Sequence, residues 1–549
     1  MKKRLSRSIR QHLPPFDPFL VAVAVYLVAC LVLGGGTREG FVSDVALQGL
    51  AVPLLLWASW RLLDAPALEG GGRGRTALAN CLMIAALPLA QVVPLPPSVW
   101  VLLPGRSDFE SSLHAAGLEV GWLPISLAPS LTWLSGLALL PPMAVFLGVL
   151  QLGYAGRRRL SLVILSVGMV SVGLGLLQVA QGPASPLRFY ALTNTSEAVG
   201  FFAYRNHYSA LLYCLVLIAA AFAVAAVADF ARAGLALKST RSTPHVIAAL
   251  ASFTVLFILV GAQVMARSRA GLGLTVVALF AAFALAYVAP VGVTGSQRSA
   301  HAGHATRGAT RLLVAAISLA VLFGVQFALY RVMHRFQFDA LSDARLPFAR
   351  NTIEAAITYM PFGSGMGTFV PVYQAFEKAS DNVASAYANH AHNDFLELWL
   401  EAGLIGLVAM MLFVVWVLRA SWRVWRRGLP GAGHLDNLLA CAAVLALMLL
   451  LAHAAVDYAL RATALMAIFA WASAMAIAPV GPQQELPELR SSARRRRSDA
   501  PTRHGAEVEA VTEPDQARTT PSRRFVPTPP RDDWPETWQP RKDPKPSDD

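Results

Sequence analysis

The sequence predicts an all-α polytopic membrane protein with about 12 transmembrane helices and a large external loop near its C-terminal end. Only 14% of the 549 residues are charged, whereas a soluble chain carries about 25%. Hydrophobic residues make up 55% of the chain and gather in runs long enough to cross a hydrocarbon core of about 30 Å. The mean hydropathy is +0.50. These observations exclude a soluble enzyme and a fibrous or fully disordered protein.

The apolar runs define twelve candidate spans. The first run follows a basic start, MKKRLSRSIR, but no small-residue cleavage site comes after it, so we expect an uncleaved span. An even number of spans places both termini on one side of the membrane. The expected spans are residues 18–35, 44–60, 77–94, 129–152, 159–180, 206–228, 244–264, 270–289, 312–331, 402–419, 437–457 and 462–479.

Basic residues predict which loops face the cytoplasm, because cytoplasmic loops carry an excess of Lys and Arg. These residues gather in alternate loops, around residues 61–75, 157–159, 232–241, 298–311 and 419–427. We therefore expect these loops and both termini to be cytoplasmic. The opposite loops are predicted to be external and comprise residues 95–128, 181–205, 265–269 and 332–401.

The chain is expected to comprise an N-terminus at 1–17, a membrane domain at 18–480 and a cytoplasmic tail at 481–549. The tail holds 12 of the 35 prolines and shows no apolar periodicity, which predicts disorder. Its 13 basic and 13 acidic residues balance, so the net charge of +13 lies in the membrane part and does not indicate a nucleic-acid partner. The basic run Arg494–Arg497 is either a topology determinant or a site for anionic lipid or a partner. The four cysteines lie inside apolar runs and indicate neither a disulfide framework nor a metal site.

Three clusters of polar residues lie on the predicted external side. A single external arginine can reach the membrane interface by snorkelling, whereas several that converge favour an anionic ligand. Guanidinium suits phosphate because it binds oxygens bidentately and stays charged. The clusters contain Arg205, Asn206 and His207; Arg267 and Arg269; and Arg345, Arg350, His390, His392, Asn393 and Asp394.

The histidines of the third cluster leave two roles open. His392 is either a catalytic base or a structural histidine that caps the helix beginning near Asn393. His390, His392 and Asp394 together suggest a metal site. No further ligand follows at zinc-like spacing, so we predict no metal.

Two neighbouring features are also open to more than one interpretation. The run Gly363-Ser364-Gly365-Met366-Gly367 lacks the lysine and the strand–helix context of a P-loop, which favours a flexible turn over a phosphate cradle. Glu397 and Glu401 lie on the next helix and either orient the histidine or face the aqueous boundary.

At these residues the chain resembles the O-antigen ligase family. His392-Asn393, followed after nine residues by Gly403-Leu404-Ile405-Gly406, resembles that family's histidine signature, and further similar segments bring the resemblance to about residues 195–420. The family also includes O-antigen and exopolysaccharide polymerases and protein O-oligosaccharyltransferases. The long tail and the large 95–128 loop depart from the family pattern and leave the subfamily open. The further segments read FFAYRNHYSALL, ARSRAGLGL, RLPFARNTIEAAITYMPFGSGMGTF and AHNDFLELWLEAGLIGL.

The resemblance implies metal-independent transfer of a glycan from undecaprenyl diphosphate to a periplasmic acceptor, such as the lipid A core, by a protein of the bacterial inner membrane. His392 matches the family's catalytic histidine, which we interpret as a general base. Direct attack on the anomeric carbon predicts inversion. We expect no cofactor, and as partners only the lipid-linked donor, a glycan or lipid A core acceptor and the bilayer. The expected diphosphate-binding residues are Arg205 and Arg269, with Arg267 and Arg345 as lesser candidates, and the supporting residues are Asn206, His207, His390, Asn393 and Asp394.

A transporter and a non-catalytic assembly protein are the more distant alternatives. A secondary transporter of this size would show internal repeats and ionisable or helix-broken positions near the middle of the membrane. The chain shows no such repeat, and its spans are almost free of charge at their centres. Asp457 and Arg461 lie at the end of a span.

Overall fold

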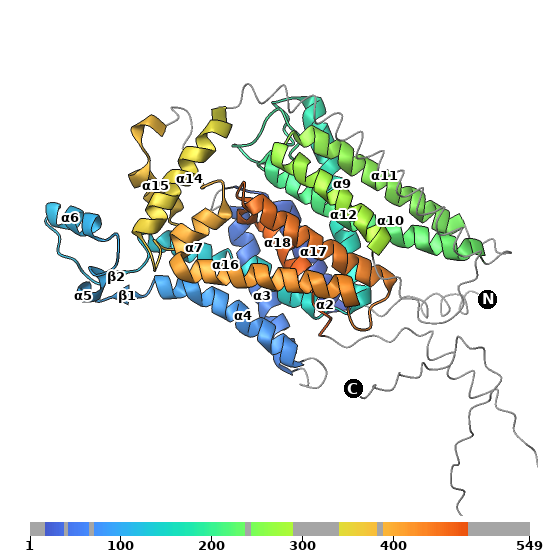
Figure 1. Ribbon diagram of the computed structural model, residues 1–549, viewed down its shortest axis with the longest axis horizontal. Helices are drawn as coiled ribbons and strands as arrows, with labels where there is room; N and C mark the ends of the chain where they lie inside the picture. The colour runs from blue at the N-terminus through green and yellow to red at the C-terminus, as the bar shows by residue number, and fades with distance from the viewer. Residues whose placement is uncertain are drawn as a thin grey trace, which may run out of the picture. The chain divides into compact units, whose positions relative to one another are not determined.

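The computed structural model describes residues 17–37, 42–64, 71–235, 243–288, 340–381 and 388–480. The chain divides into two units, Met1–Gln484 and Glu485–Asp549, and every described residue belongs to the first. Helices dominate this unit (Figure 1), and its described strands are the two-residue β1 and β2. The predicted all-α class is therefore confirmed. The tail at 481–549 lies outside the described residues.

Eight helical stretches in the described ranges are long and apolar enough to cross a membrane. Two further apolar helices are shorter, α2 (Pro18–Leu33) and α18 (Thr463–Met475). The third predicted span corresponds to α4 (Gly71–Gln91), and the predicted span at 312–331 lies outside the described residues. The number of twelve thus stays a prediction. The eight stretches are α3 (Val42–Asp64), α7 with α8 (Pro129–Leu137 and Leu140–Leu150), α9 (Tyr154–Gln181), α10 (Arg205–Leu235), α11 (Thr243–Ala266), α12 (Arg269–Val288), α16 (Asp394–Arg427) and α17 (His434–Ala454).

Helix α10 forms the centre of the bundle. It packs against α11, α12 and α17, and 89% of its most apolar stretch is buried. A helix that is apolar all round needs such an environment, because no polar face is left for water. The corresponding stretch of α3 is only 22% buried, and its exposed side chains include Leu56 and Trp60. Such an apolar surface is what a bilayer would cover.

The predicted span at 129–152 is interrupted. Helix α7 ends at Leu137 and α8 begins at Leu140, with Pro141 and Pro142 in its first turn. Proline lacks a backbone N–H and its ring clashes with the preceding turn, so it is favoured in the first turn of a helix. The break therefore lies just before these prolines, and Pro129–Leu150 as a whole is long and apolar enough for the predicted span.

The two large predicted external loops contain regular structure. In the first, β1 (Pro94–Leu95) pairs antiparallel with β2 (Leu123–Pro124), with α5 (Pro97–Trp100) and α6 (Ser107–Ala115) between them. In the second, the described part of the predicted loop contains several helices, and α16 begins at Asp394, which confirms the helix expected near Asn393, and continues through the predicted span at 402–419. Phe348, Tyr373 and Leu400 belong to a small hydrophobic core of this region. Its helices are α14 (Ala340–Thr358), α15 (Phe369–Phe376) and the 3-10 helix η3 (Ala379–Asp381).

Loops predicted to share a side of the membrane lie together. Ala203 N donates to Gly35 O at 3.0 Å, and Ala198 N donates to Met265 O at 3.1 Å. At the opposite ends of the spans, Val480 N donates to Leu150 O at 3.1 Å. This grouping agrees with the charge pattern of the sequence, while the membrane side of each group stays a prediction.

Candidate active site

His392 lies in the turn that leads into α16. Asn393 caps the helix, because its Oδ1 accepts from Phe395 N at 3.0 Å and Leu396 N at 3.1 Å. Its Nδ2 also donates to Ala455 O at 2.9 Å. Since the cap is Asn393, the alternative in which His392 caps the helix was wrong. His392 itself has a left-handed backbone, with φ at 50°, and its side chain is 17% exposed.

A buried carboxylate holds the His392 ring. Nδ1 of His392 lies 3.0 Å from Oδ1 of Asp457, whose side chain is fully buried. Asp457 also accepts from Nδ2 of Asn206 and, at 3.0 Å, from Tyr458 N. Burial by itself would raise the pKa of Asp457, but the hydrogen bond and charge of His392 hold it well below the usual value. The carboxylate therefore stays ionised and fixes which ring nitrogen of His392 is left for a substrate.

Aromatic side chains surround the same pair. The ring of Tyr458 lies 5.0 Å from that of His392 and 4.4 Å from that of His390, measured between centroids. Tyr458 also stacks on Tyr204 at 5.6 Å and meets the edge of the buried His207 at 5.0 Å. The first and third polar clusters of the sequence are thus brought together through Asp457 and Tyr458.

Arg205 begins α10 and is anchored by the loop before it. Its Nη1 lies 3.1 Å from Oε1 of Glu197, and its backbone N–H donates to Asn194 Oδ1 at 2.9 Å. Arg188 contacts the same loop, because its Nη1 donates to the carbonyls of Asn194 and Glu197 at 2.6 and 3.0 Å.

Several donors of these two arginines have no hydrogen-bond partner in the described part of the chain. They are Nε of Arg205 and both Nε and Nη2 of Arg188, all buried from solvent. Buried guanidinium donors without an acceptor are unusual, and an anion would satisfy them. Arg188 lies among the polar residues of the 181–205 loop, but no sequence motif distinguishes it from its neighbours.

The other predicted diphosphate ligands lie at separate positions. Arg267 is exposed in the turn between α11 and α12 and has a left-handed backbone, with φ at 52°. Arg269 begins α12 and is partly buried. Arg345, on α14, is exposed and interacts electrostatically with His453 near the end of α17. Among the contacts described, none joins these arginines to His392.

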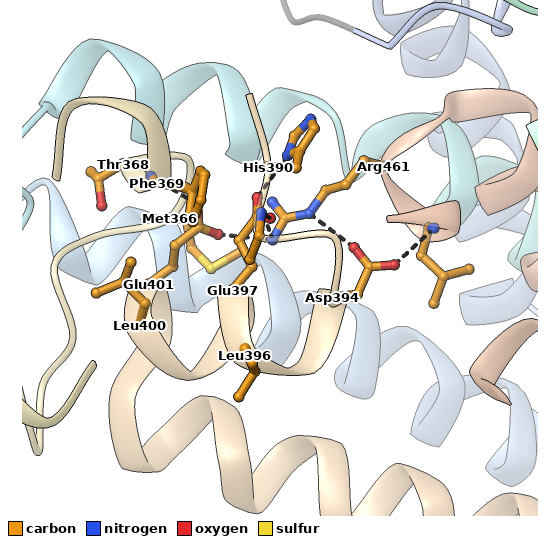
Figure 2. A network of polar contacts seen from close by, with 12 residues as sticks. Met366, Thr368, Phe369, His390, Asp394, Leu396, Glu397, Leu400, Glu401 and Arg461 are labelled. Atoms are coloured by element: carbon orange, nitrogen blue, oxygen red, sulfur yellow. Dashed lines mark hydrogen bonds and ion pairs between the residues drawn. The ribbon is translucent and has the colours of Figure 1, made fainter. Parts of the chain in front are cut away.

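His390 and Asp394 belong to a charged network beside the His392 turn (Figure 2). Nδ1 of His390 lies 2.8 Å from Oε1 of Glu397, and Ala391 N donates to Oε2 of Glu397 at 2.9 Å. Burial lowers the pKa of His390, but the charge of Glu397 and its hydrogen bond outweigh this and raise it above 6.5. Glu397 therefore holds the residues before His392 rather than the His392 ring.

Arg461 joins the carboxylates of this network. It ends the 3-10 helix η4 (Ala459–Arg461), and its guanidinium lies 3.4 Å from Asp394, 3.3 Å from Glu397 and 3.1 Å from Glu401. Glu397 and Glu401 are 1% and 0% exposed. The alternative in which these two glutamates face the aqueous boundary was therefore wrong.

The run Gly363-Ser364-Gly365-Met366-Gly367 packs against a bend in α16 at Gly403. At Gly403 the helix has φ at 57° and ψ at −142°, so Leu400 and Glu401 need other donors for their carbonyls. Ser364 N donates to Leu400 O at 2.9 Å, and Gly365 N donates to Glu401 O at 3.0 Å. These N–H groups are engaged, which argues against a phosphate cradle and for a turn fixed by the helix.

Among the residues described, no group of three or more His, Cys, Asp or Glu side chains is arranged to hold a metal ion.

Comparison with known proteins identifies one family. Residues 230–411 match the family model described as O-antigen ligase. No curated protein matches the chain. The matched segment includes His392 and Gly403, whereas Arg205 and Asp457 lie outside it. The match supports the resemblance to the O-antigen ligase and polymerase family that the sequence motifs indicated.

Proposed function

We propose that this chain is a glycosyltransferase that transfers a glycan from undecaprenyl diphosphate to the lipid A core in the periplasm. The observation that carries the proposal is the 3.0 Å contact between His392 Nδ1 and buried Asp457, because it prepares a histidine of the family signature to act as a base. The resemblance to the family supports the substrate class.

The proposed reaction uses His392 as general base. With Nδ1–H donating to Asp457, the neutral ring presents Nε2 to the hydroxyl of the acceptor. The hydroxyl oxygen attacks the anomeric carbon while its proton passes to Nε2. The bond from that carbon to the diphosphate oxygen breaks, and its electron pair leaves with the diphosphate. Attack on the face opposite the leaving group inverts the anomeric carbon.

The charge that develops on the diphosphate needs positive partners, and the proposed reaction uses arginines for this without a metal. Arg205 and Arg188 offer buried donors that lack acceptors in the described part of the chain. Arg205 is next to Asn206, which contacts Asp457. Arg269, Arg267 and Arg345 are further candidates for the same role. Donors fixed in a partly dehydrated site stabilise a developing anion more strongly than water does.

The proposed location is the inner membrane, with both termini cytoplasmic and the site in the periplasm. The ligase, polymerase and protein O-oligosaccharyltransferase of this family differ in their acceptor.

The experiment deletes the gene for this chain in its host and supplies the gene again in wild-type or variant form. Wild type, His392→Ala and Asp457→Asn are expressed at equal membrane levels, with Arg350→Gln as a matched control at an exposed ion pair. We expect wild type and Arg350→Gln to restore long-chain surface glycan on gels, and the other two to fail. The molecule to which the restored glycan is attached identifies the acceptor. Full complementation by His392→Ala would refute the catalytic role.

A further inference from the structure

The short connection between α17 and α18 contacts the His392 turn at both of its ends. Asp457, near its start, binds the ring of His392. Arg461, near its end, binds the first turns of α16 through Glu397 and two other carboxylates. Figure 2 shows the Arg461 guanidinium lying between Asp394 and the two glutamates of α16. The same connection thus touches both the side chain of His392 and the helix that follows it.

Glu397 holds the backbone just before His392. It accepts from Nδ1 of His390 at 2.8 Å and from Ala391 N at 2.9 Å. His392 has φ at 50°, and a left-handed backbone costs an L-residue about 1–2 kcal/mol. Such a conformation persists only where its surroundings determine it. The contacts of Glu397 are therefore among those that fix where the His392 side chain points.

Arg461 allows Glu397 to be buried in that position. Glu397 is 1% exposed, and a buried carboxylate without a cation is strongly unfavourable. Nη2 of Arg461 lies 3.3 Å from Glu397 and 3.1 Å from Glu401, while Nε lies 3.4 Å from Asp394. A lysine ammonium is a single point charge and lacks the planar fork that serves several carboxylates at once.

We propose that Arg461 is a positioning residue for glycan transfer. Through Glu397 it sets the backbone of residues 390–392, and so the place where Nε2 of His392 meets the acceptor hydroxyl. This inference rests on the proposed function, because the position of His392 matters only if His392 is the base. A purely structural arginine would lower thermal stability and leave the turnover of the folded enzyme unchanged.

The test measures turnover of the full chain in lipid nanodiscs. The donor is undecaprenyl-diphosphate-linked oligosaccharide extracted from the host, and the acceptor is lipid A core from the host. We expect Arg461→Gln to lower kcat about 100-fold, since a misplacement of about 1 Å can cost this much. The KM for the donor should stay within about twofold, because the base does not contribute to donor binding. Arg461→Lys keeps the charge and should lower kcat about 10-fold.

A double variant tests the path through Glu397. Glu397→Gln should lower kcat about as much as Arg461→Gln, and the combination of both should be no worse than the stronger single change. Arg350→Gln serves as the matched control, because Arg350 pairs with Asp381 at 2.8 Å but is 57% exposed. It should keep the kcat of wild type.

Each contrary outcome has a distinct meaning. Wild-type kcat in a folded Arg461 variant, or effects that multiply in the double variant, would overturn the positioning role. If Arg461→Gln fails to fold, as judged by Tm and size exclusion, Arg461→Lys decides the question because it retains the charge. If wild type transfers no glycan, or His392→Ala transfers it as fast as wild type, the proposed function fails instead.

Discussion

His392 and Asp457 are 65 residues apart in the chain, yet Nδ1 of the histidine lies 3.0 Å from a carboxylate oxygen of the aspartate. One residue precedes α16 and the other follows α17, so the packing of these two helices creates the contact. An imidazole bonded to a carboxylate in this way is fixed in tautomer and orientation.

Replacement of Asp457 by asparagine should remove most of the activity. The amide can donate to Nδ1 and so favours the tautomer in which Nε2 carries the proton and cannot act as a base. We expect kcat to fall by about 10²–10⁴-fold, measured as transfer from the lipid-linked donor. Asp64→Asn, at the exposed C-terminal end of α3, is the control and should be close to wild type. Activity near wild type in Asp457→Asn would show that the carboxylate does not set the tautomer.

The pair of His390 and Glu397 should make stability depend on pH. The pKa of His390 is raised above 6.5 in the folded protein, so its contribution is fully present below pH 6.5 and is lost as the pH rises through the raised pKa. We expect the Tm difference between wild type and His390→Asn to be larger at pH 6 than at pH 9. An equal difference at both pH values would contradict a charged His390.

The bend of α16 should not tolerate a side chain. Gly403 has φ at 57°, and a Cβ there would lie 2.2 Å from Pro361 O. We expect Gly403→Ala to lower Tm, because the backbone strain alone costs about 1–2 kcal/mol. Gly261→Ala is the matched control, since a Cβ at that helical position meets no atom within 4 Å. That change should raise stability by about 0.5–1 kcal/mol. A stable Gly403→Ala variant would mean that the bend can relax.

Arg188 should contribute to donor binding. Arg188→Lys keeps the positive charge but loses the Nε and Nη2 donors, which have no partner among the described residues. We expect the affinity for undecaprenyl diphosphate to fall about 10-fold, which corresponds to a loss of roughly 1.4 kcal/mol of binding free energy. Arg350→Lys should bind the lipid as wild type does. If Arg188→Lys lowers only Tm and leaves binding unchanged, Arg188 anchors the loop and does not touch the donor.

The sequence predicts the membrane class and part of the site well. Apolar runs identify spans because the bilayer imposes a minimum length on each helix. The His392-Asn393 motif identifies the turn before α16, because Asn393 is a residue type that caps helices. The break between α7 and α8 lies just before Pro141 and Pro142, where proline favours the first turn of a new helix.

The remaining contacts of the site arise from tertiary packing, so no pattern in the neighbouring sequence predicts them. Nothing around Asp457 indicates that its carboxylate faces His392, because the two residues belong to different helices. The same holds for Arg461 and Glu397, which are brought together only when η4 packs against α16. Helices α14 and α15 escaped prediction because their small core forms with residues elsewhere, such as Leu400. A buried ionisable residue at the end of a span is the one general indication that such contacts exist.

The contact between α10 and the α17–α18 connection also constrains the order of events during synthesis. Asn206 lies in the first turn of α10, whereas Asp457 follows α17 and is synthesised 251 residues later. A nascent chain that has inserted the whole family-matched segment still lacks the carboxylate that orients His392. The transfer proposed for this chain would therefore begin only after α17 and the connection that follows it have been synthesised.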